Sequence, residues 1–344
     1  MTRDVLADDL DGAFDRTREL WTELAGTRIL LTGATGFVGT HLLESVAHAR
    51  RRTGINARVV ALVRSEAALH RRLPWTENAD WLELIVGDVT DFAAPVGAID
   101  LIVHAANTAA AAVVRADART LARTVGEGTR HVVAVGANAG ARRFLQLSSG
   151  SVYGAHYGPA EPISEEDTGE PEGDSPAVLL ARAKREADAE LSARGGSPSA
   201  IIARGFAFCG PWLPLDQDFA FGNFLRDGLH GQPIKIAGDG TPMRSYLYSS
   251  DIIAWLWTLL LRGAAGRAYN VGSEQALSIG ELAARVAAEF DVAVDGPGRV
   301  AEQASAHWHV PSTARARSEL GLVETVGIDE AISRTARWWR ARGL

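Results

Sequence analysis

Short runs of apolar residues, many of them β-branched, alternate with longer helical patterns along the first part of the chain. A continuous apolar run bounded by Gly, Asp or Ser is typical of a strand that is buried on both faces of a parallel sheet. We expect such strands at residues 28–31, 57–63, 84–86, 101–106, 144–147 and 200–203. The two longest helices are expected at about 109–139 and 176–194. Strands that alternate with helices in this way predict an α/β fold with a doubly wound parallel sheet.

The alternation ends at about Arg204, and isolated helices separated by longer loops follow. Ser278 and Glu281 have the spacing of a capping box, which predicts a helix from there to about Phe290. The tail at residues 329–342 has the pattern of an amphipathic helix. The change in pattern predicts a second, smaller α/β lobe.

One more helix is expected over the strongly apolar residues 252–262. Asp251 is a residue type that caps helix N-termini, and Gly263 is one that ends helices. We therefore predict that the carboxylate of Asp251 caps this helix.

A glycine-rich segment, T-G-A-T-G-F-V-G at residues 32–39, stands between the first expected strand and the first long helical pattern that follows it. In a dinucleotide-binding βαβ unit, Gly33 would allow the tight turn, Gly36 would let backbone N–H groups approach a pyrophosphate, and Gly39 would let the helix pack closely on the strand. The phosphates would lie at the helix N-terminus, where unpaired N–H groups and the helix dipole favour an anion. The context predicts a dinucleotide site rather than an ordinary turn.

These patterns divide the chain into three expected parts. Residues 1–26 form a helical extension and residues 27–204 a dinucleotide-binding Rossmann domain. Residues 205–344 form a substrate-binding lobe, from which residues 245–275 return to the Rossmann domain. A chain of 344 residues is long enough for more than one core.

The composition changes this picture little but excludes some functions. The formal net charge of −7 gives no positive surface for nucleic acid or for an acidic membrane. The one cysteine, Cys209, cannot form a disulfide within the chain, and the most apolar run, residues 252–261, is about half as long as a membrane span. The acidic first residues are unlike a signal peptide. We expect a cytoplasmic enzyme without a metal site.

The end of the second strand indicates which dinucleotide is bound. An acidic residue there bonds the ribose hydroxyls of NAD, whereas an arginine pairs with the 2′-phosphate of NADP. This chain has Arg64 and Ser65 at that place, with no carboxylate before Glu66. NADP is therefore expected in preference to NAD; the alternative is that Arg64 is only a solvated residue at a strand end. Asp88, after the third strand, would either face the adenine or cap its own turn.

Further motifs follow in order between residues 32 and 313: G-D-V-T-D, H-A-A, L-S-S-G-S-V-Y-G, G-P-W-L-P, G-D-G-T-P-M-R-S-Y and Y-N-V-G-S-E. With the glycine-rich segment, this ordered series resembles the extended short-chain dehydrogenase/reductase family, in its nucleotide-sugar epimerase and dehydratase group. The resemblance implies a nicotinamide dinucleotide and a nucleotide diphosphate sugar held between two lobes. It also implies a homodimer in which the helices at about 109–139 and 176–194 form a four-helix interface.

The resemblance implies roles for individual positions. Ser149 and Lys184 would be the catalytic serine and lysine. Ser151 would contact the substrate, and Arg244 and Asn223 would bind its diphosphate; the alternatives are a surface salt bridge for Arg244 and a turn for Asn223. The cofactor would contact Gly33, Thr35, Gly36, Phe37, Val38, Arg64, Asp88, Val89, Ala105, Ala106 and Lys184.

The catalytic helix departs from the family pattern at one position. The family has Tyr-x-x-x-Lys, in which the tyrosine moves the substrate hydroxyl proton while hydride passes to or from nicotinamide, and the lysine lowers the tyrosine pKa and holds the ribose. Here Lys184 is present, and the tyrosine position holds Leu180. Leucine carries no proton, and it is expected to pack in an apolar stripe with Ala183, Ala187 and Leu191.

Another group would then have to carry the proton, and the sequence favours none of the candidates. These candidates are Tyr153, Tyr157, Cys209, His156 and the carboxylates near Glu165. Two further positions narrow the reaction. Gly150 and Ser151 stand where the dehydratases of the family have an Asp-Glu pair, which argues against a 4,6-dehydratase.

Three functions stay open. The first, which we expect, is an epimerase or ketoreductase (an isomerase or an oxidoreductase) whose proton passes through Ser149, a water or a displaced residue. The second is a non-redox enzyme on the same scaffold, which catalyses a rearrangement or an elimination around a structural dinucleotide. The third is a binding or sensor protein that never changes the redox state of its dinucleotide, although Ser149 and Lys184 argue against it.

Overall fold

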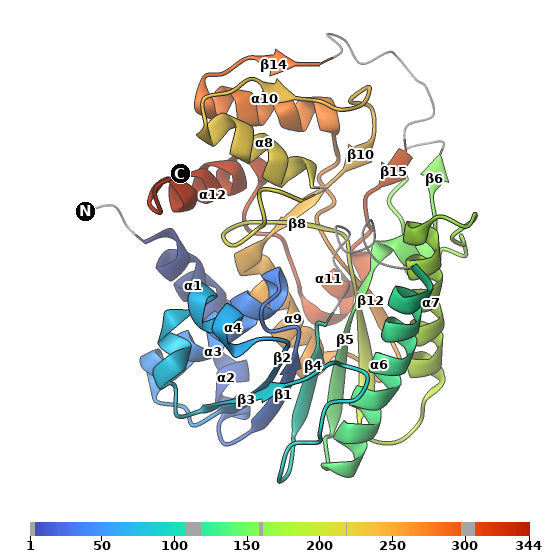
Figure 1. The fold of residues 1–344 in the computed structure, drawn as a ribbon. Coiled ribbons are helices and arrows are strands. Elements are labelled where there is room, and N and C mark those ends of the chain that lie inside the picture. The colour runs from blue at the N-terminus through green and yellow to red at the C-terminus, as the bar shows by residue number, and fades with distance from the viewer. Residues whose placement is uncertain (1–3, 107–117, 158–160, 218, 297–306) are drawn as a thin grey trace.

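The computed structural model describes residues 4–106, 118–157, 161–217, 219–296 and 307–344, and it places their side chains except at 118–121 and 157. Figure 1 shows two parts: a wide sheet flanked by helices below, and a smaller lobe of helices and short strands above. No helix within the described ranges is long and apolar enough to cross a membrane.

A seven-stranded parallel sheet forms the lower part (Figure 1). Its strand order is β12-β7-β5-β4-β1-β2-β3, and all neighbouring pairs are parallel. The order reverses between β1 and β4, as in a doubly wound Rossmann sheet. The strands are β1 (Arg28–Thr32), β2 (Arg58–Val63), β3 (Leu82–Val86), β4 (Leu101–His104), β5 (Arg143–Ser149), β7 (Ser199–Gly205) and β12 (Ala268–Val271).

Six of these strands confirm the expected ones to within two residues at each end, and with them the predicted fold class. The exception is β12, which was not identified as a strand. It pairs with β7 through Ala268 opposite Ile202 and forms one edge of the sheet. The second part of the chain therefore returns to the first to complete the sheet.

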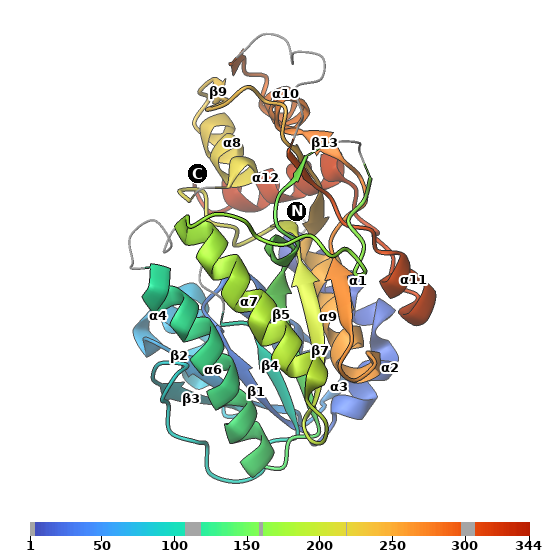
Figure 2. The same ribbon diagram turned by 90° about the vertical axis from the view of Figure 1, so that its right-hand side faces the viewer.

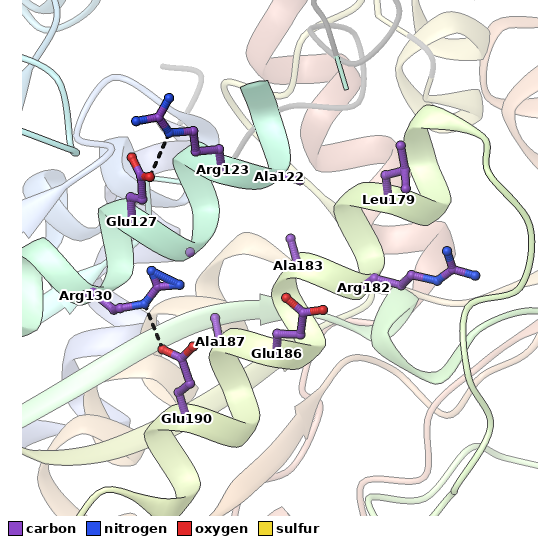
Figure 3. Close-up of a pocket in the computed structure, with 11 residues that line it drawn as sticks. Ala122, Arg123, Glu127, Arg130, Leu179, Arg182, Ala183, Glu186, Ala187 and Glu190 are labelled. Atoms are coloured by element: carbon purple, nitrogen blue, oxygen red, sulfur yellow. Dashed lines mark hydrogen bonds and ion pairs between the residues drawn. The ribbon is translucent and has the colours of Figure 1, made fainter. Parts of the chain in front are cut away.

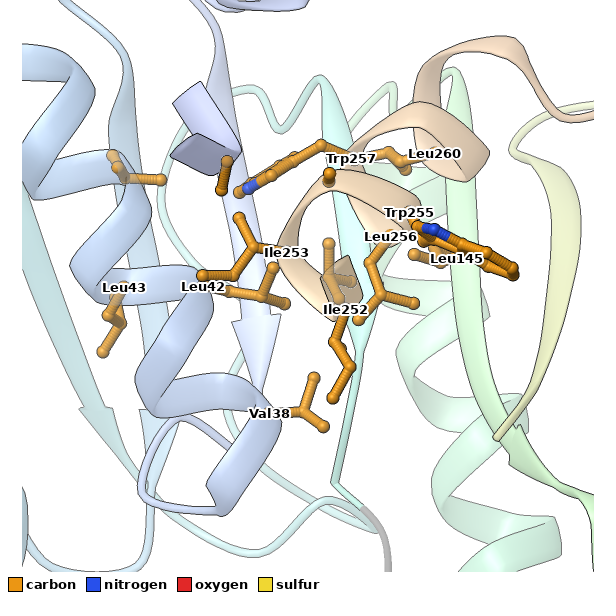
Figure 4. Packing of buried hydrophobic residues seen from close by; sticks show 14 of the residues in the cluster. Val38, Leu42, Leu43, Leu145, Ile252, Ile253, Trp255, Leu256, Trp257 and Leu260 are labelled. Atoms are coloured by element: carbon orange, nitrogen blue, oxygen red, sulfur yellow. The ribbon is translucent and has the colours of Figure 1, made fainter. Parts of the chain in front are cut away.

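Helices cover both faces of the sheet (Figure 2). The helices α6 (Ala118–Asn138) and α7 (Pro176–Ala193) lie side by side on one face, and α3 (Phe37–Thr53) and α9 (Ser249–Arg262) lie on the other. In Figure 4, Val38 and Leu42 of α3 point toward Ile252 and Ile253 of α9, all within one buried cluster. The expected helix at 109–139 is confirmed from residue 118 onward, and its first residues, 109–117, lie outside the described residues.

The N-terminal helices α1 (Val5–Arg16) and α2 (Arg18–Leu24) pack on α9, and α1 also contacts α3. The buried carboxylate of Asp9 ties α1 to the upper lobe, because it accepts hydrogen bonds from the hydroxyl of Tyr248 and from Arg334, each at 2.6 Å. Burial raises the pKa of Asp9 to about 6. The N-terminal extension is thus built into both parts of the molecule.

The upper lobe holds three longer helices and several short strands. The capping box of Ser278 and Glu281 is confirmed: each side chain accepts a hydrogen bond from the backbone N–H of the other residue. The helices are α8 (Ala220–Leu229), α10 (Ile279–Phe290) and α12 (Ile328–Arg340). A four-stranded sheet runs in the order β13 (Leu277–Ser278), β10 (Met243–Arg244), β15 (His307–His309) and β6 (His156–Tyr157).

Shorter elements complete the described fold. Two two-stranded sheets pair β8 (Ala207–Cys209) with β11 (Tyr246–Tyr248), and β9 (Ile234–Lys235) with β14 (Val294–Asp295). The short helices are α4 (Glu66–Arg72), α11 (Ala314–Leu320), η1 (Pro74–Asn78) and η2 (Gly150–Tyr153).

The predicted cap of α9 is wrong. The helix begins at Ser249, and Asp251 lies inside its first turn with no exposed surface. Its carboxylate accepts hydrogen bonds from the backbone N–H groups of Thr325 and Val326 and pairs with Arg16 at 2.9 Å. The carboxylate of Asp251 therefore bonds to a loop that is distant in the sequence and does not cap the helix. The predicted end at Gly263 is confirmed.

Candidate active site

The glycine-rich loop lies at the point where the strand order reverses, between β1 and β4. Gly33 has a φ of +73°, and a Cβ on it would stand 2.4 Å from the carbonyl oxygen of Ala105. A Cβ on Gly39 would stand 2.2 Å from the carbonyl oxygen of Gly33. Close approach of backbones therefore requires both glycines. Ligands of open α/β sheets bind in the crevice at such a reversal.

The N-terminus of α3 is open to an anion. Gly36 is the N-cap residue, is exposed, and leaves the helix without a side-chain cap or an acidic residue in its first turn. Thr35 and Phe37 on either side are half-buried, whereas the side chain of Val38 packs into the core. The free N–H groups of this 17-residue helix suit the pyrophosphate of a dinucleotide.

The residues that we expected to contact the adenosine of the dinucleotide lie at the ends of β2 and β3. Arg64 is exposed, and Ser65 caps α4 with its hydroxyl. Asp88 is exposed and caps its own turn, since its carboxylate accepts hydrogen bonds from the N–H and hydroxyl of Thr90 at 3.0 and 2.7 Å. These bonds lower the pKa of Asp88, with a further contribution from Arg64. Val89 is half-buried and faces Gly128 of α6.

The end of β4 is fixed to the glycine-rich loop through Thr32. Its hydroxyl oxygen accepts a hydrogen bond from the N–H of Ala106 at 3.1 Å and lies 2.7 Å from Nδ1 of His104. Burial lowers the pKa of His104 to about 4, so this imidazole is neutral near pH 7. Ala105 and Ala106 are half-buried at the crevice, and the residues that follow them lie outside the described part of the chain.

Ser149 ends β5 beside Gly205 of β7 and also caps η2. Its hydroxyl oxygen accepts a hydrogen bond from the N–H of Ser151 at 3.1 Å, which leaves the hydroxyl proton available to a ligand. Gly150 lies against Phe206, because a Cβ on Gly150 would stand 2.8 Å from that ring. An acidic side chain at 150 would require the ring to move.

Lys184 lies on α7 with only 8% of its surface exposed. Its amine makes no hydrogen bond or ion pair with any residue that the structure describes. Burial lowers the pKa of Lys184 to about 8, and the negative charge of Asp188 limits the shift. Leu180, one turn earlier, is buried, as are Ala187 and Leu191 of the expected apolar stripe.

A buried polar network adjoins this lysine. Arg204 of β7 donates to the carboxylate of Asp188 at 3.0 Å and to the hydroxyl oxygen of Tyr153 at 2.9 Å. Tyr153 donates to the side-chain oxygen of Asn270 at 2.7 Å, and the N–H of Asn270 donates to Glu165 at 2.7 Å. The network joins α7 and β7 to the loop after β6 and to β12.

Arg244 and Asn223 lie in the upper lobe, on β10 and α8. Arg244 donates to the carbonyl oxygen of His307 at 3.1 Å, and its guanidinium lies 2.9 Å from Nδ1 of that residue. Asn223 accepts a hydrogen bond from Arg226 at 3.2 Å. Asn223 lies within a helix, not in the turn that the sequence left open as its alternative.

Sequence reasoning missed the histidines beside Arg244. His309 pairs in register with Arg244, and its ring lies 4.6 Å from that of Phe206 and 6.2 Å from that of His307. The alternation of His307 and His309 around a tryptophan, with the period of two of a strand, was the available signal. The rings of Phe206, His309 and His307 therefore form a continuous row of contacts between Gly150 and Arg244.

A comparison with known protein families shows to which family the chain belongs. The model of the NAD dependent epimerase/dehydratase family matches residues 29–272, which is more than half of the chain. The chain belongs to this family. Within the match lie the glycine-rich loop, Ser149, Lys184 and Arg244.

Relatives in the family carry out different reactions. UDP-glucuronic acid decarboxylase 1 of Arabidopsis thaliana is 26% identical over 92% of this chain and 71% of its own length. dTDP-D-glucose 4,6-dehydratase of Mus musculus is 24% identical over 91% of this chain and 88% of its own length. The family is therefore that of nucleotide-sugar decarboxylases, dehydratases and epimerases.

Solved structures of family members superpose on most of the chain. MoeE5 in complex with UDP-glucuronic acid and NAD is 26% identical, with a TM-score of 0.73 over 92% of this chain and 99% of that one. DesIV, a dTDP-glucose 4,6-dehydratase from Streptomyces venezuelae solved with NAD, is 23% identical, with a TM-score of 0.76 over 92% and 97%. The likeness to DesIV shows that the two proteins share a fold.

Most of the candidate proton carriers named from the sequence make contacts within the protein or are buried. Tyr153 is buried, and burial raises its pKa to about 12. Cys209 is fully buried, which raises its pKa, and Glu165 accepts a hydrogen bond from the backbone of β12. His156 faces Asp167 at 3.0 Å. The side chain of the remaining candidate, Tyr157, lies outside the described residues.

Proposed function

We propose that this member of the family is an NAD(P)-dependent enzyme that modifies a nucleotide sugar by epimerisation or keto reduction, without the family's catalytic tyrosine. The proposal rests on a complete glycine-rich loop after β1, together with Ser149 at the end of β5 and Lys184 on α7, the helix that packs on β5. A protein that only bound dinucleotide would have no need of the nearly buried amine of Lys184, since an unpaired buried charge is costly.

The cofactor contacts follow the ends of successive strands. Gly33, Gly36 and the first turn of α3 hold the pyrophosphate, with Thr35, Phe37 and Val38 around it. Asp88, Val89, Ala105 and Ala106 line the adenosine side, and Lys184 reaches the nicotinamide ribose. Exposed Arg64 favours NADP over NAD, because a guanidinium binds a 2′-phosphate and no acidic residue precedes it on β2.

The substrate contacts lie on the other side of the crevice. Arg244 and Asn223 bind the diphosphate, and Ser149 with Ser151 faces the sugar. The ring of Phe206 over Gly150 supports epimerisation or reduction over dehydration, because it fills the space in which a dehydratase needs an acid. Known binding of UDP-glucuronic acid by MoeE5 and of UDP-glucose by the 4-epimerase of Thermotoga maritima supports this class of ligand.

A panel of nucleotide sugars tests the function. The purified protein is mixed with UDP- and dTDP-hexoses and with UDP-glucuronic acid, each with NADP and with NAD. We expect transient reduction of the nicotinamide with at least one sugar and an epimerised or reduced product by NMR. Release of carbon dioxide from UDP-glucuronic acid would instead show that the enzyme is a decarboxylase.

The absence of a redox change across the whole panel would contradict the proposal. Turnover with an unchanged dinucleotide would then favour a rearrangement or an elimination around a structural cofactor. Tight dinucleotide binding without any turnover would favour a binding protein.

We also propose that the protein is a homodimer through α6 and α7. A groove of about 350 Å³ lies between these helices, and Figure 3 shows its charged rim. α6 contributes Arg123, Glu127 and Arg130, and α7 contributes Arg182, Glu186 and Glu190. Arg130 and Glu190 pair with each other at 3.1 Å within the chain. A two-fold axis that sets these two helices against those of a second copy would bring charges of both signs together.

Native mass spectrometry tests the dimer. We expect the mass of two chains for the wild type and weaker association for Glu186→Arg, because Glu186 lines the groove and makes no ion pair within the described residues of its own chain. A wild type that stays monomeric at micromolar concentration would contradict this interface.

A further inference from the structure

The amine of Lys184 has an unusual place among the basic groups of the chain. Lysine occurs only twice, at Lys184 and Lys235, among 35 lysine and arginine residues. Lys235 is exposed on β9, whereas Lys184 is 8% exposed on α7. Arginine stays protonated at any physiological pH, and lysine is the basic side chain that burial can bring to the neutral form. A fixed positive charge would not have required lysine at this position.

The counterion nearest to this amine is held by another group. Asp188 lies one turn after Lys184, yet its carboxylate pairs with Arg204 at 3.0 Å, and that guanidinium also holds the hydroxyl of Tyr153. The amine itself has no ion pair within the described residues. Asp188 therefore acts on Lys184 only at longer range, which leaves burial as the larger effect on its pKa, now about 8.

Among the groups that the structure describes, Asp188 on the same helix is the one whose charge acts on this amine. Arg204 from β7 pairs with that carboxylate, and Ser148 of β5 approaches it. Glu127 and Arg130 of the neighbouring α6 face the outer groove instead (Figure 3). A lysine with a pKa near 8 is in the range that enzymes use for general acid–base work.

Three of the other candidates are held or enclosed in the described structure: Tyr153 and Cys209 are buried, and Glu165 accepts a hydrogen bond from the backbone of β12. His156 lies on β6, where it faces Asp167. Leu180 gives α7 no titratable group at the tyrosine position. Because residues four apart lie on one helical face, Lys184 is the next titratable side chain along that face.

We propose that Lys184 is itself the proton carrier of the reaction, in the role that tyrosine has elsewhere in the family. This inference rests on the proposed function. The neutral amine accepts the proton of a secondary alcohol of the sugar, directly or through one water. The C–H electron pair leaves as hydride to the oxidised nicotinamide, the carbon–oxygen double bond forms, and the proton stays on Nζ as an ammonium. The reverse step returns the proton to the oxygen when hydride returns to the carbon.

A titration of the two lysines tests the state of the amine without any turnover. Protein labelled with ¹³C and ¹⁵N in lysine gives two side-chain NMR signals, which Lys235→Arg assigns. The signal of Lys235 serves as the exposed internal reference. We expect the Lys184 signal to titrate near pH 8. Titration in the ordinary lysine range, near 10.5, would overturn the proposal.

Variants test the transfer itself. Lys184→Arg keeps a cation but cannot accept a proton, so the rate of nicotinamide reduction should fall about 10²-fold or more, while dinucleotide affinity changes by only a few fold. Lys184→Ala should regain part of its rate with added primary amines, which a purely structural residue would not do. The wild-type rate should rise tenfold per pH unit up to about pH 8 and then level off. Lys235→Arg is the matched control and should leave rate and profile unchanged.

The outcomes separate the two proposals. If the wild type reduces nicotinamide with a nucleotide sugar and Lys184→Arg matches it in rate and pH profile, the role of Lys184 is wrong and the function stands. If no nucleotide sugar reduces the nicotinamide of the wild type, the function is wrong and this inference falls with it.

Discussion

The glycine-rich loop after β1 and the helix α7 carry the two halves of the proposed site, and they differ in what fixes their residue types. At the loop, Gly33 and Gly39 have no room for a Cβ, so backbone geometry fixes the residue type. On α7, Lys184 is present but Leu180 stands where we place the family's tyrosine. A position where two backbones touch has room only for glycine, whereas a proton can be carried by any titratable group within reach. Dinucleotide binding is thus the constrained part of this site, and the proton route is the part that can change.

The largest expected effect is on the α7 side. Arg204→Met removes the partner of buried Asp188 and should lower the free energy of unfolding by about 3–5 kcal/mol, because an uncompensated charge stays buried. The exposed pair of Arg285 and Asp329 offers a matched control, and Arg285→Met should cost about 0.5 kcal/mol or less. Urea unfolding measures both. Equal costs would show that the buried network does not support α7.

The second effect tests the loop side. Gly33→Ala combines a left-handed backbone with a clash against Ala105, and it should cost about 3 kcal/mol and abolish dinucleotide binding. Gly54 has nearly the same φ, +70°, with no atom within 4 Å of an added Cβ. Gly54→Ala should therefore cost about 1 kcal/mol and leave binding intact. Thermal unfolding and dinucleotide titration compare the two, and similar losses would contradict the role of close approach.

The third effect has the opposite sign. Lys184→Met removes a buried charge and should stabilise the protein by about 2–3 kcal/mol at pH 7. The native pKa of Lys184, about 8, lies below its ordinary value of 10.5, so the charged form is penalised in the folded state. The penalty is complete below pH 8 and disappears above about pH 10.5, so wild-type stability should rise relative to the variant across that window. Unfolding curves at several pH values measure the difference, and a destabilised variant at pH 7 would contradict it.

The sequence predicted the sheet side of the molecule well because its signals are local. Apolar runs located six strands, and the spacing of glycines located the loop, since both depend on neighbouring residues. Asp251 failed as a helix cap because Thr325, far along the chain, takes its carboxylate. The partners of Lys184 were not predictable for the same reason. Asp188 and Arg204 meet only when α7 packs on β7.

The upper lobe shows the same limit. Arg244 was found through the resemblance to the family, but its contact with His307 joins strands that are 63 residues apart. The row of His307 and His309 was visible as an alternation in the sequence, yet nothing local indicated which face of the strand would meet Phe206. Residue types at a site can be predicted from spacing; the electrostatics among them needs the fold.

The smallest effect concerns which dinucleotide binds at the loop side. Arg64→Ala should weaken NADP binding about tenfold and leave NAD binding unchanged, because a guanidinium–phosphate hydrogen bond contributes about 1.5 kcal/mol. Titration of the intrinsic fluorescence with both dinucleotides measures the two affinities. Equal losses for NADP and NAD would show that Arg64 does not contact the 2′-phosphate.

Backbone contacts fix the glycine-rich loop, whereas we propose that a residue other than tyrosine carries the proton. The most direct test of this difference is to place a tyrosine at position 180. Leu180→Tyr should leave dinucleotide affinity within a few fold of the wild type and raise the rate of nicotinamide reduction at pH 7 by about tenfold or more, because a positioned phenol beside Lys184 supplies the missing acid–base group. The rate should also lose its dependence on a group with a pKa near 8. An unchanged rate with an unchanged pH profile, in a variant that folds and binds dinucleotide, would contradict the account.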